Sequence, residues 1–254
     1  MNAVENKVKP IFKTTFTFSH LRFCIFIRLL EKEKTMRNLF TILALALLFS
    51  CQNAAQNNEK QQKVINATPV EVPLENGKAK AYFASGCFWC VEAVYESIKG
   101  VDEVINGYSG GYTDNPTYEA SNTGRTGHAE AVEVIYDPKV VSFSTLVDAY
   151  FASQNPTQVN GQGPDKGSQY RSIIFYQNDE QKNIILEKKE ALAKQLDAKI
   201  AAEVYPFQKF WVAEDYHQNY ERLHPNNGYI RNVSIPRLKR FQAKFPKELL
   251  KESH

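Results

Sequence analysis

Two successive strand–helix–strand patterns set the strongest limit on how this chain can fold. In each pattern, two short apolar or alternating runs flank a stretch whose apolar residues recur at helical spacing. The predicted strands are 79–84, 101–108, 129–136, 171–176 and 200–204, and the predicted helices are 88–98, 142–153 and 179–196, the last capped by Asp179. This order predicts an α+β fold: a two-layer α/β plait with a ferredoxin-like core, in which helices pack on one mixed sheet. After Glu214 we expect an irregular C-terminal segment of short helices and loops.

The length and composition fit one domain of this kind with appendages. A normal core needs about 100 to 200 residues, and this chain has 254. With 43% hydrophobic and 23% charged residues, the composition is that of ordinary globular proteins, which excludes wholesale disorder and a multi-span membrane protein. A net charge of +3 is too small to indicate nucleic acid as a partner.

The segment that begins at Met36 has the features of an export signal. A basic start precedes an apolar run that ends at Phe49, and this run is shorter than the about 20 apolar residues of a membrane-spanning helix. The residues around Cys51 are similar to the signal of bacterial lipoproteins, although Phe49 stands where a small residue is usual. We therefore expect a signal peptide at 36–50 and a lipid on Cys51. The protein would then be anchored in the bacterial cell envelope, facing the periplasm or the exterior.

The remaining boundaries follow from composition. Residues 1–35 show no domain pattern, and we expect either a non-native extension, with Met36 as the true start, or a longer leader that is also removed. Residues 51–76 are mostly Gln, Asn, Lys, Glu and Pro, which bury too little apolar surface to offset the entropy of ordering. This stretch is predicted to be a flexible tether. The folded domain then spans 77–230, and a helical tail spans 231–254.

Two cysteines remain in the predicted domain, since Cys24 lies in the leader and Cys51 is the expected lipid site. A disulfide within the domain must join Cys87 and Cys90, and closing so short a loop adds little stability in the chain-entropy model. A redox role is therefore favoured over a structural staple. Zinc is a poor third choice and no metal is predicted, because a structural site needs about four ligands and no second Cys pair or closely spaced His pair accompanies this one.

Cys87 is placed to act as a nucleophile. It follows the turn residues Ser85 and Gly86, at the point where the first predicted strand passes into a helix. The unpaired amides of a helix N-terminus carry partial positive charge, which stabilises a thiolate.

The residues between the cysteines sharpen this interpretation. The run Gly86-Cys87-Phe88-Trp89-Cys90 resembles the Gly-Cys-Phe-Trp signature of A-type peptide methionine sulfoxide reductases. Other segments resemble the family in the same order: Gly107–Tyr112, Asn115–Tyr118, Thr126–Val132, Tyr136–Pro138, Asp165–Ser172 and Ala213–Gln218. The similarity spans roughly Lys80 to Tyr229, essentially the whole predicted domain.

The resemblance implies a thiol-dependent reduction of methionine S-sulfoxide, free or protein-bound. The Cys87 thiolate attacks the sulfur, and Glu130 matches the family's acid, which protonates the oxygen. Strand alternation independently places Glu130 on the same face as Val132 and Val134, and burial among apolar groups raises the pKa of a carboxyl. A solvated Glu at a strand end is the alternative without the surrounding motif.

The resemblance also implies six substrate-binding residues: Phe88, Trp89, Tyr118, Asp165, Tyr170 and Tyr229. The tyrosines donate hydrogen bonds to the sulfoxide oxygen. The two aromatic residues after Cys87 receive the methyl group, and the aspartate contacts the substrate or positions water. Outside the motif, the aromatic residues would more often be packing residues, and the aspartate would be a turn residue.

Regeneration of the thiol departs from the common family pattern. Oxygen transfer leaves Cys87 as a sulfenic acid, and many members carry resolving cysteines near the carboxyl end. This chain has no cysteine beyond Cys90, so Cys90 is the expected resolver. Direct reduction of the sulfenic acid by an external thiol stays open. The resemblance implies a thioredoxin-like dithiol as electron donor and no cofactor.

Two other functions compete with this one. A general dithiol–disulfide oxidoreductase would use Cys87 and Cys90 but leave the Glu130, Tyr118 and Tyr170 segments without a purpose. An anchored binding lipoprotein would use the pair as a structural disulfide, and Cys87 would then react slowly with alkylating reagents.

The predicted C-terminal tail is basic and partly apolar. Its basic residues are Arg237, Lys239, Arg240, Lys244 and Lys247, interleaved with Leu238, Phe241 and Phe245. Such a pattern occurs in helices that lie on membrane surfaces, but a basic solvated face on a terminal helix is the commoner explanation.

Overall fold

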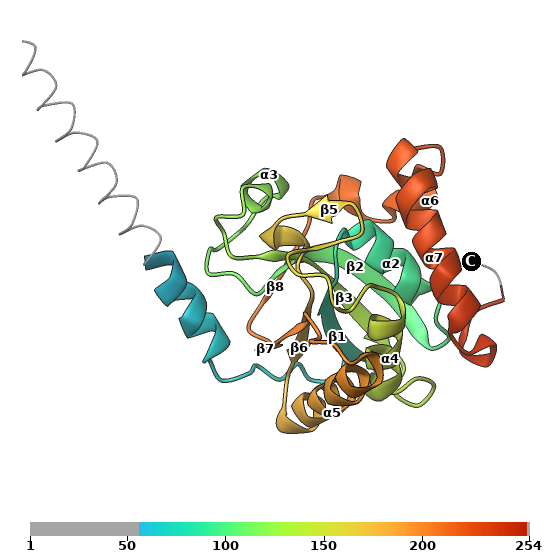
Figure 1. Ribbon diagram of the computed structural model, residues 1–254, viewed down its shortest axis with the longest axis horizontal. Helices are drawn as coiled ribbons and strands as arrows, with labels where there is room; N and C mark the ends of the chain where they lie inside the picture. Colours follow the sequence, from blue (N-terminus) through green and yellow to red (C-terminus); the bar gives the residue numbers. More distant parts are fainter. Residues whose placement is uncertain (1–55, 253–254) are drawn as a thin grey trace, which may run out of the picture. The chain divides into compact units, whose positions relative to one another are not determined.

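A mixed six-stranded sheet with helices packed on it forms the centre of residues 56–252, which are the residues described by this computed structural model (Figure 1). The expected extension at 1–35, the signal peptide at 36–50 and the lipid site Cys51 lie outside the described residues. Within the described part of the chain, no helix combines the length and the apolar character needed to cross a membrane.

The sheet has the strand order β7-β6-β1-β3-β2-β8. Its strands are β1 (Ala79–Ala84), β2 (Val101–Ser109), β3 (Ala129–Tyr136), β6 (Ile173–Tyr176), β7 (Glu203–Pro206) and β8 (Phe210–Val212). Only β6 and β7 pair in parallel; the other neighbours in this sheet are antiparallel. The four central strands, together with the helices that connect β1 to β2 and β3 to β6, form the predicted α/β plait. The predicted α+β fold class is confirmed.

The helices and the short elements complete the chain. The α-helices are α2 (Phe88–Glu96), α3 (Tyr118–Asn122), α4 (Phe143–Ala152), α5 (Asp179–Leu196), α6 (Tyr220–Leu223) and α7 (Ile235–Lys244). Short helical turns lie at η1 (Ser168–Tyr170), η2 (Asp215–His217), η3 (Ile230–Ser234) and η4 (Lys247–Leu249), and a small hairpin joins β4 (Gly161–Gln162) to β5 (Asp165–Lys166). The segment after Glu214 therefore consists of short helices and loops, as predicted.

Several predicted bounds differ from the structure by one to three residues, and two of the differences concern a helix cap and a strand start. The side chain of Asn178, rather than Asp179, caps α5 by accepting a hydrogen bond from the Gln181 amide. The strand expected at 200–204 is β7, which begins later, at Glu203. Ile200 and Ala202 are buried, but they belong to the loop that leads into the strand.

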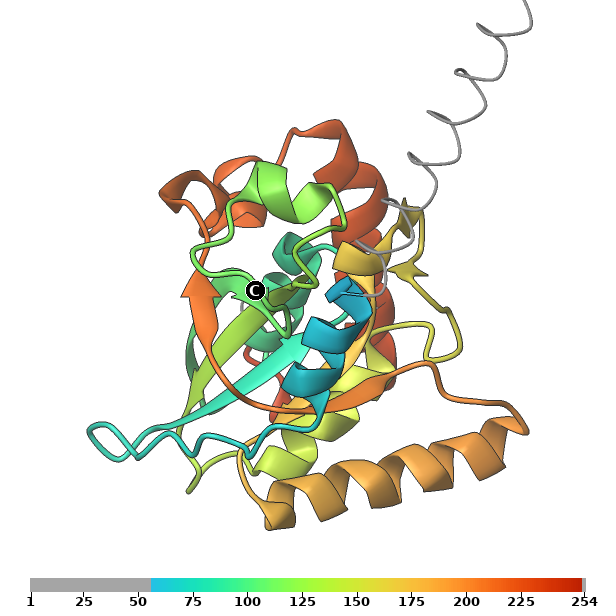
Figure 2. The same cartoon turned by 90° about the vertical axis from the view of Figure 1, so that its left-hand side faces the viewer.

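One face of the sheet is covered by the segment that was expected to be a tether. Residues 56–65 form a helix, and Ile65 and Val72 pack against a buried cluster that includes Tyr82 and Phe175 (Figure 2). The Val70 amide also donates a 2.8 Å hydrogen bond to the carbonyl of Phe207. The described part of this stretch is therefore not a flexible tether, because a few apolar residues and backbone hydrogen bonds hold it to the sheet.

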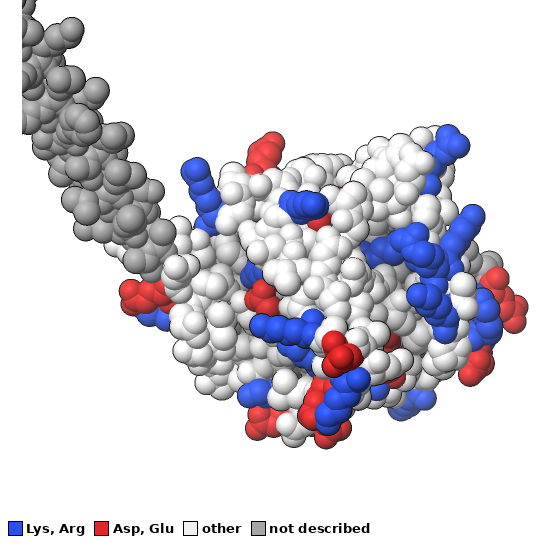
Figure 3. Space-filling view, viewed as in Figure 1, with Lys and Arg blue, Asp and Glu red and all other residues white. Residues whose placement is uncertain are grey.

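The C-terminal helix α7 belongs to the core of the domain. Its buried Leu238 and Phe241, together with the following Phe245, join the cluster formed by the other face of the sheet. Its opposite side is basic: Figure 3 shows Lys and Arg side chains gathered over the face that carries α7. The described part of the predicted tail, residues 231–252, is thus packed on the domain.

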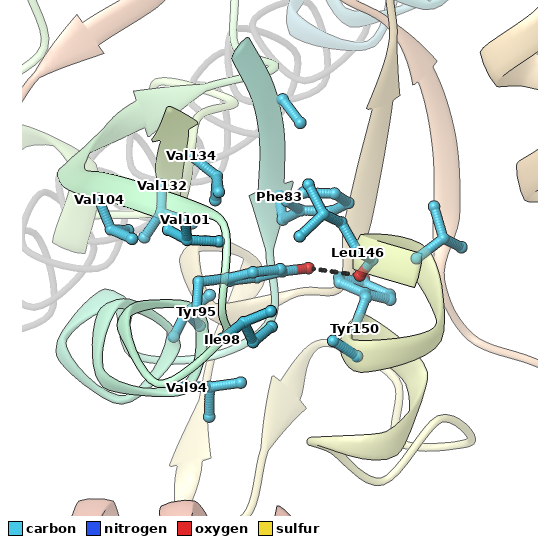
Figure 4. Packing of buried hydrophobic residues seen from close by; sticks show 14 of the residues in the cluster. Phe83, Val94, Tyr95, Ile98, Val101, Val104, Val132, Val134, Leu146 and Tyr150 are labelled. Atoms are coloured by element: carbon cyan, nitrogen blue, oxygen red, sulfur yellow. Dashed lines mark hydrogen bonds between the residues drawn. The ribbon is translucent and has the colours of Figure 1, made fainter. Parts of the chain in front are cut away.

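The main core lies between this second face of the sheet and the helices α2 and α4. Phe83, Tyr95 and Leu146 are fully buried there and meet as shown in Figure 4. The Tyr95 hydroxyl donates a 3.1 Å hydrogen bond to the carbonyl of Leu146, which satisfies the one polar atom that this side chain brings into the core. These contacts fix the position of α2, whose first turn carries the two cysteines.

Candidate active site

A tight turn between β1 and α2 positions Cys87. Gly86 has a φ of +81°, and a Cβ atom at this position would lie 2.6 Å from the Cβ of Gln162. Glycine is therefore required both for the left-handed backbone and for the close approach of the β4–β5 hairpin. Cys87 follows as the N-cap residue of α2.

Eight of the nine predicted catalytic and substrate-binding residues line one cavity of about 240 Å³. The lining consists of Cys87, Phe88, Trp89, Tyr118, Glu130, Asp165, Tyr170, Asn227 and Tyr229. Cys90 is the predicted residue that does not line it. Asn227 was not predicted; its side chain accepts a 2.8 Å hydrogen bond from the Tyr229 amide and so fixes the turn that presents Tyr229.

Glu130 is a buried acid at the base of this cavity. Glu130 is only 2% exposed, and its Oε2 accepts a 3.0 Å hydrogen bond from the Phe88 amide. Burial raises the pKa of Glu130 to about 8, although the hydrogen bond from the amide opposes the shift. The carboxyl is therefore protonated over much of the neutral range and can donate a proton.

The two thiols form a coupled pair. Both cysteines are free and buried. Burial raises the pKa of Cys87, whereas hydrogen bonding with Cys87 and the positive charge of Arg237 lower the pKa of Cys90 to about 7. Burial of Cys87 opposes the stabilisation that the first-turn amides give to its thiolate. The pair therefore favours negative charge on Cys90.

Tyr229 links Cys90 to Asp165. Its hydroxyl donates a 2.6 Å hydrogen bond to Oδ2 of Asp165 and lies 3.6 Å from Sγ of Cys90. Burial raises the pKa of Asp165, and the hydrogen bond from Tyr229 partly offsets this.

Arg237 brings a buried positive charge to the same turn. The residue is 7% exposed, and its guanidinium donates hydrogen bonds to the carbonyls of Ser85 and Ser153 and to the hydroxyl of Ser85. No carboxylate of the described residues lies within 4.0 Å of the guanidinium. The nearby thiol of Cys90 thus feels a positive charge that no close carboxylate neutralises.

The aromatic wall of the cavity is held from behind. The indole of Trp89 donates a 3.2 Å hydrogen bond to Nδ1 of His217 and stacks on Tyr220 at a centroid distance of 3.8 Å. His217 is only 1% exposed and contacts the ring of Phe88 at 4.9 Å. His217 is thus a buried support of the wall.

Glu214 holds Tyr118 in place from another segment. Its Oε1 accepts a hydrogen bond of 2.9 Å from the Tyr118 amide, and its Oε2 accepts one of 3.0 Å from the Tyr108 hydroxyl. On the other side of the cavity, the hydroxyl of Tyr170 has no hydrogen-bond partner among the described residues, so it is free to donate to a ligand. Burial raises the pKa of Tyr118 and of Tyr170, so both hydroxyls keep their protons at neutral pH.

A metal site is not formed by side chains of the described residues. Among residues 56–252, no three His, Cys, Asp or Glu side chains come together as metal ligands would. The polar groups that line the cavity are the thiol of Cys87, the carboxyls of Glu130 and Asp165, the amide of Asn227 and the hydroxyls of the tyrosines.

Comparisons with known proteins agree on one family. Residues 79–249 match the model of the family described as peptide methionine sulfoxide reductase. The peptide methionine sulfoxide reductase MsrA of Pasteurella multocida is 49% identical over 166 residues, which cover 65% of this chain and 95% of the relative. The corresponding MsrA of Polynucleobacter asymbioticus is 48% identical over 171 residues, covering 65% and 88%.

Solved structures show the same similarity. Methionine sulfoxide reductase A of Corynebacterium diphtheriae has 34% sequence identity and a TM-score of 0.55, over 64% of this chain and 84% of that chain. Mxr1 from Saccharomyces cerevisiae in its reduced form has 33% identity and a TM-score of 0.57, over 65% and 94%.

Proposed function

The chain belongs to the peptide methionine sulfoxide reductase family and is an A-type enzyme of it, and from this premise we propose that Cys87, Glu130 and Cys90 carry out the reduction. The observation that supports the proposal most is the position of the buried carboxyl of Glu130 in the same cavity as Cys87. The substrate is the S epimer of methionine sulfoxide, free or within a protein.

In the proposed complex, the sulfoxide oxygen lies toward Glu130 and the hydroxyls of Tyr118 and Tyr170. The methyl group lies against the rings of Phe88 and Trp89. Hydroxyl and carboxyl donors stabilise the negative charge that builds on the oxygen during attack, and the apolar rings exclude water from the reacting sulfur.

The first step moves two protons and transfers the oxygen from the substrate sulfur to Cys87. The proton of Cys87 passes to the Cys90 thiolate, with which Cys87 shares a hydrogen bond. The Cys87 thiolate attacks the sulfoxide sulfur while Glu130 transfers its proton to the oxygen. The hydroxyl then moves to the Cys87 sulfur, which gives methionine and a sulfenic acid.

The second step joins the two cysteines. Cys90 attacks the sulfur of the Cys87 sulfenic acid, and the hydroxyl leaves as water with the proton that Cys90 gives up. The net reaction converts a sulfoxide and two thiols into methionine, a disulfide and water. A thioredoxin-like dithiol then reduces the disulfide, and the cycle needs no cofactor.

A single-turnover experiment tests this proposal. The full chain is reduced, freed of reductant and mixed with one equivalent of a peptide that contains methionine S-sulfoxide, and methionine and the state of both cysteines are measured by mass spectrometry. We expect one methionine and a Cys87–Cys90 disulfide. With Cys90→Ser we expect one methionine and a sulfenic acid on Cys87, and with Cys87→Ser no methionine.

Two results would contradict the proposal at different points. The absence of methionine from the folded wild-type protein would overturn the reaction itself. Methionine formed with Cys90 still reduced would keep the reaction but overturn the role of Cys90 as resolver. The R epimer serves as the negative control, since it should give no methionine.

We also propose that Cys51 carries a lipid that holds the enzyme at the bacterial cell envelope. The proposal rests on the apolar run that ends at Phe49 and on the lipoprotein-like residues before Cys51. Labelling of cells with a radioactive fatty acid should mark the wild-type chain and leave Cys51→Ser unlabelled. Equal labelling of both would contradict it.

A further inference from the structure

A second cavity reaches the cysteine pair from the side of Cys90. It measures about 580 Å³, and its lining includes Cys90, Asp165, Arg237, Arg240 and Lys244. Cys90 does not line the first cavity, and Cys87 does not line the second. Asp165 lines both, so the two cavities are neighbours that border different cysteines of one pair.

The second cavity is strongly biased toward positive charge. Arg237, Arg240 and Lys244 are its cationic residues, and Asp165 is the one carboxylate among the residues that line it. That carboxylate already accepts the hydrogen bond from Tyr229. The cations lie on α7, which contains no acidic residue, on the face whose Lys and Arg side chains are visible in Figure 3.

Arg237 gives this cavity a fixed donor group. A guanidinium has five N–H donors, and three hydrogen bonds tie this one to Ser85 and Ser153. Because no described carboxylate pairs with it, the group can donate to an anionic ligand at little cost of rearrangement. Arg240 and Lys244 are exposed and stand at the mouth, where they attract anions from solution.

We propose, on the basis of the function proposed above, that this cavity binds the carboxylate groups of a low-molecular-weight thiol, which reduces the Cys87–Cys90 disulfide from the Cys90 side. The size of the cavity lies within the range of small-molecule sites, about 300 to 1,000 Å³. Cys90 lines the cavity but is only 2% exposed, so the opening favours a slender molecule over a folded protein, which has to insert a chain segment.

The chemistry balances with two thiols. The first thiolate attacks Sγ of Cys90, the disulfide breaks, and Cys87 leaves as a thiolate that regains a proton. A second thiolate attacks the external sulfur of the mixed disulfide and releases Cys90 as a thiolate. Two external thiols are oxidised to one disulfide, and the enzyme regains both of its thiols.

Steady-state rates with thiols of different charge test the inference on the full chain. At a saturating concentration of a methionine S-sulfoxide peptide, kcat/KM is measured for mercaptosuccinate, which carries two carboxylates, and for the neutral 2-mercaptoethanol. Both values are expressed per concentration of thiolate. We expect mercaptosuccinate to be faster by about tenfold or more. Succinate, which has no thiol, should inhibit in competition with mercaptosuccinate and not with the sulfoxide.

Variants of exposed residues locate the effect. The double variant Arg240→Gln, Lys244→Gln should lose most of the advantage of mercaptosuccinate and keep the wild-type rate with 2-mercaptoethanol. Lys239→Gln is the matched control, since Lys239 is an exposed cation of α7 that does not line the cavity, and it should behave as the wild type.

Three outcomes would overturn the inference. The first is equal rates with the two thiols in the wild type, and the second is an equal loss with both thiols in the double variant. The third is a loss of rate in the double variant only when a thioredoxin-like protein is the donor, because the basic face would then bind a protein. The single-turnover experiment above needs no external thiol, so failure here is separate from failure of the proposed reaction.

Discussion

The hydroxyl of Tyr229 donates a 2.6 Å hydrogen bond to the carboxylate of Asp165 across 64 residues of sequence. The bond joins the C-terminal segment to the β4–β5 hairpin and lies beside the sulfur of Cys90. Both residues line the substrate cavity, and Asp165 also faces the basic cavity. The hydrogen bond therefore holds a residue that lies between the two cavities.

Removing this hydroxyl should slow the reaction. Tyr229→Phe leaves Asp165 without its donor, and hydrogen bonds to charged groups contribute about 1.5 to 3 kcal/mol, so we expect the single-turnover rate of methionine formation to fall roughly tenfold. Rapid-quench measurements give this rate. Tyr176→Phe, at a buried tyrosine outside both cavities, should keep the wild-type rate. An unchanged rate in Tyr229→Phe would show that the hydroxyl has no part in the reaction.

The rate should decline at high pH because Glu130 must be protonated to act. Its pKa of about 8 predicts that the single-turnover rate falls as the pH rises through about 8. In Glu130→Gln we expect a loss of about 100-fold or more at neutral pH, the size usual for a general acid, and no decline through this range. Glu133→Gln, on the same strand and bonded to Tyr82, is the control that should retain the decline. A wild-type rate that is flat between pH 7 and 9 would argue against an acid role for Glu130.

The same carboxyl should make the protein less stable at high pH. The pKa of Glu130 is raised from 4.5 to about 8 in the folded state, so below 4.5 both states are protonated and the contribution to stability is fully present. Between these values the unfolded state loses its proton first, and stability falls as the pH rises. Glu130→Gln should abolish this pH-dependent loss of the free energy of unfolding, which is at most about 5 kcal/mol. Urea unfolding at pH 5 and pH 8 measures it, and a variant-minus-wild-type difference that does not grow with pH would refute the prediction.

His217 should affect binding of the substrate more than chemistry. His217→Phe keeps a ring behind Phe88 but removes the acceptor of the Trp89 indole, and a hydrogen bond of this kind contributes about 1 kcal/mol. We expect KM for the sulfoxide to rise several-fold with kcat changed less than twofold. His224→Phe, at an exposed position beside Tyr220, is the control. A fall in kcat with KM unchanged would assign His217 a role in the reaction steps instead.

Much of the fold could be predicted because its elements have clear periodicity. The bounds of β1, β3 and α5 agree with the predicted ranges, since turn residues and caps mark their ends. The strand at β7 was displaced because Ile200 is apolar and buried without belonging to a strand. The helix at 56–65 was missed because its contacts with the sheet depend on a few residues, such as Ile65, within a polar stretch.

The site was predictable only where the sequence carries a motif. Residues next to Cys87 and around Glu130 stand in recognisable runs, but the residues that hold them act through contacts distant in sequence. Arg237 lies 152 residues from Ser85, to which it donates, and no local pattern distinguishes it from the other basic residues of α7. Arg237 is one of the groups that lower the pKa of Cys90, after the hydrogen bond with Cys87, and its position beside the pair could not be predicted from sequence.

The shared wall at Asp165 has a consequence for the order of events during repair. If the disulfide is reduced through the second cavity as proposed, the reductant enters on the Cys90 side while the substrate occupies the cavity on the Cys87 side. The disulfide can then be reduced before the repaired methionine leaves, and release of the product and renewal of the thiols become independent steps.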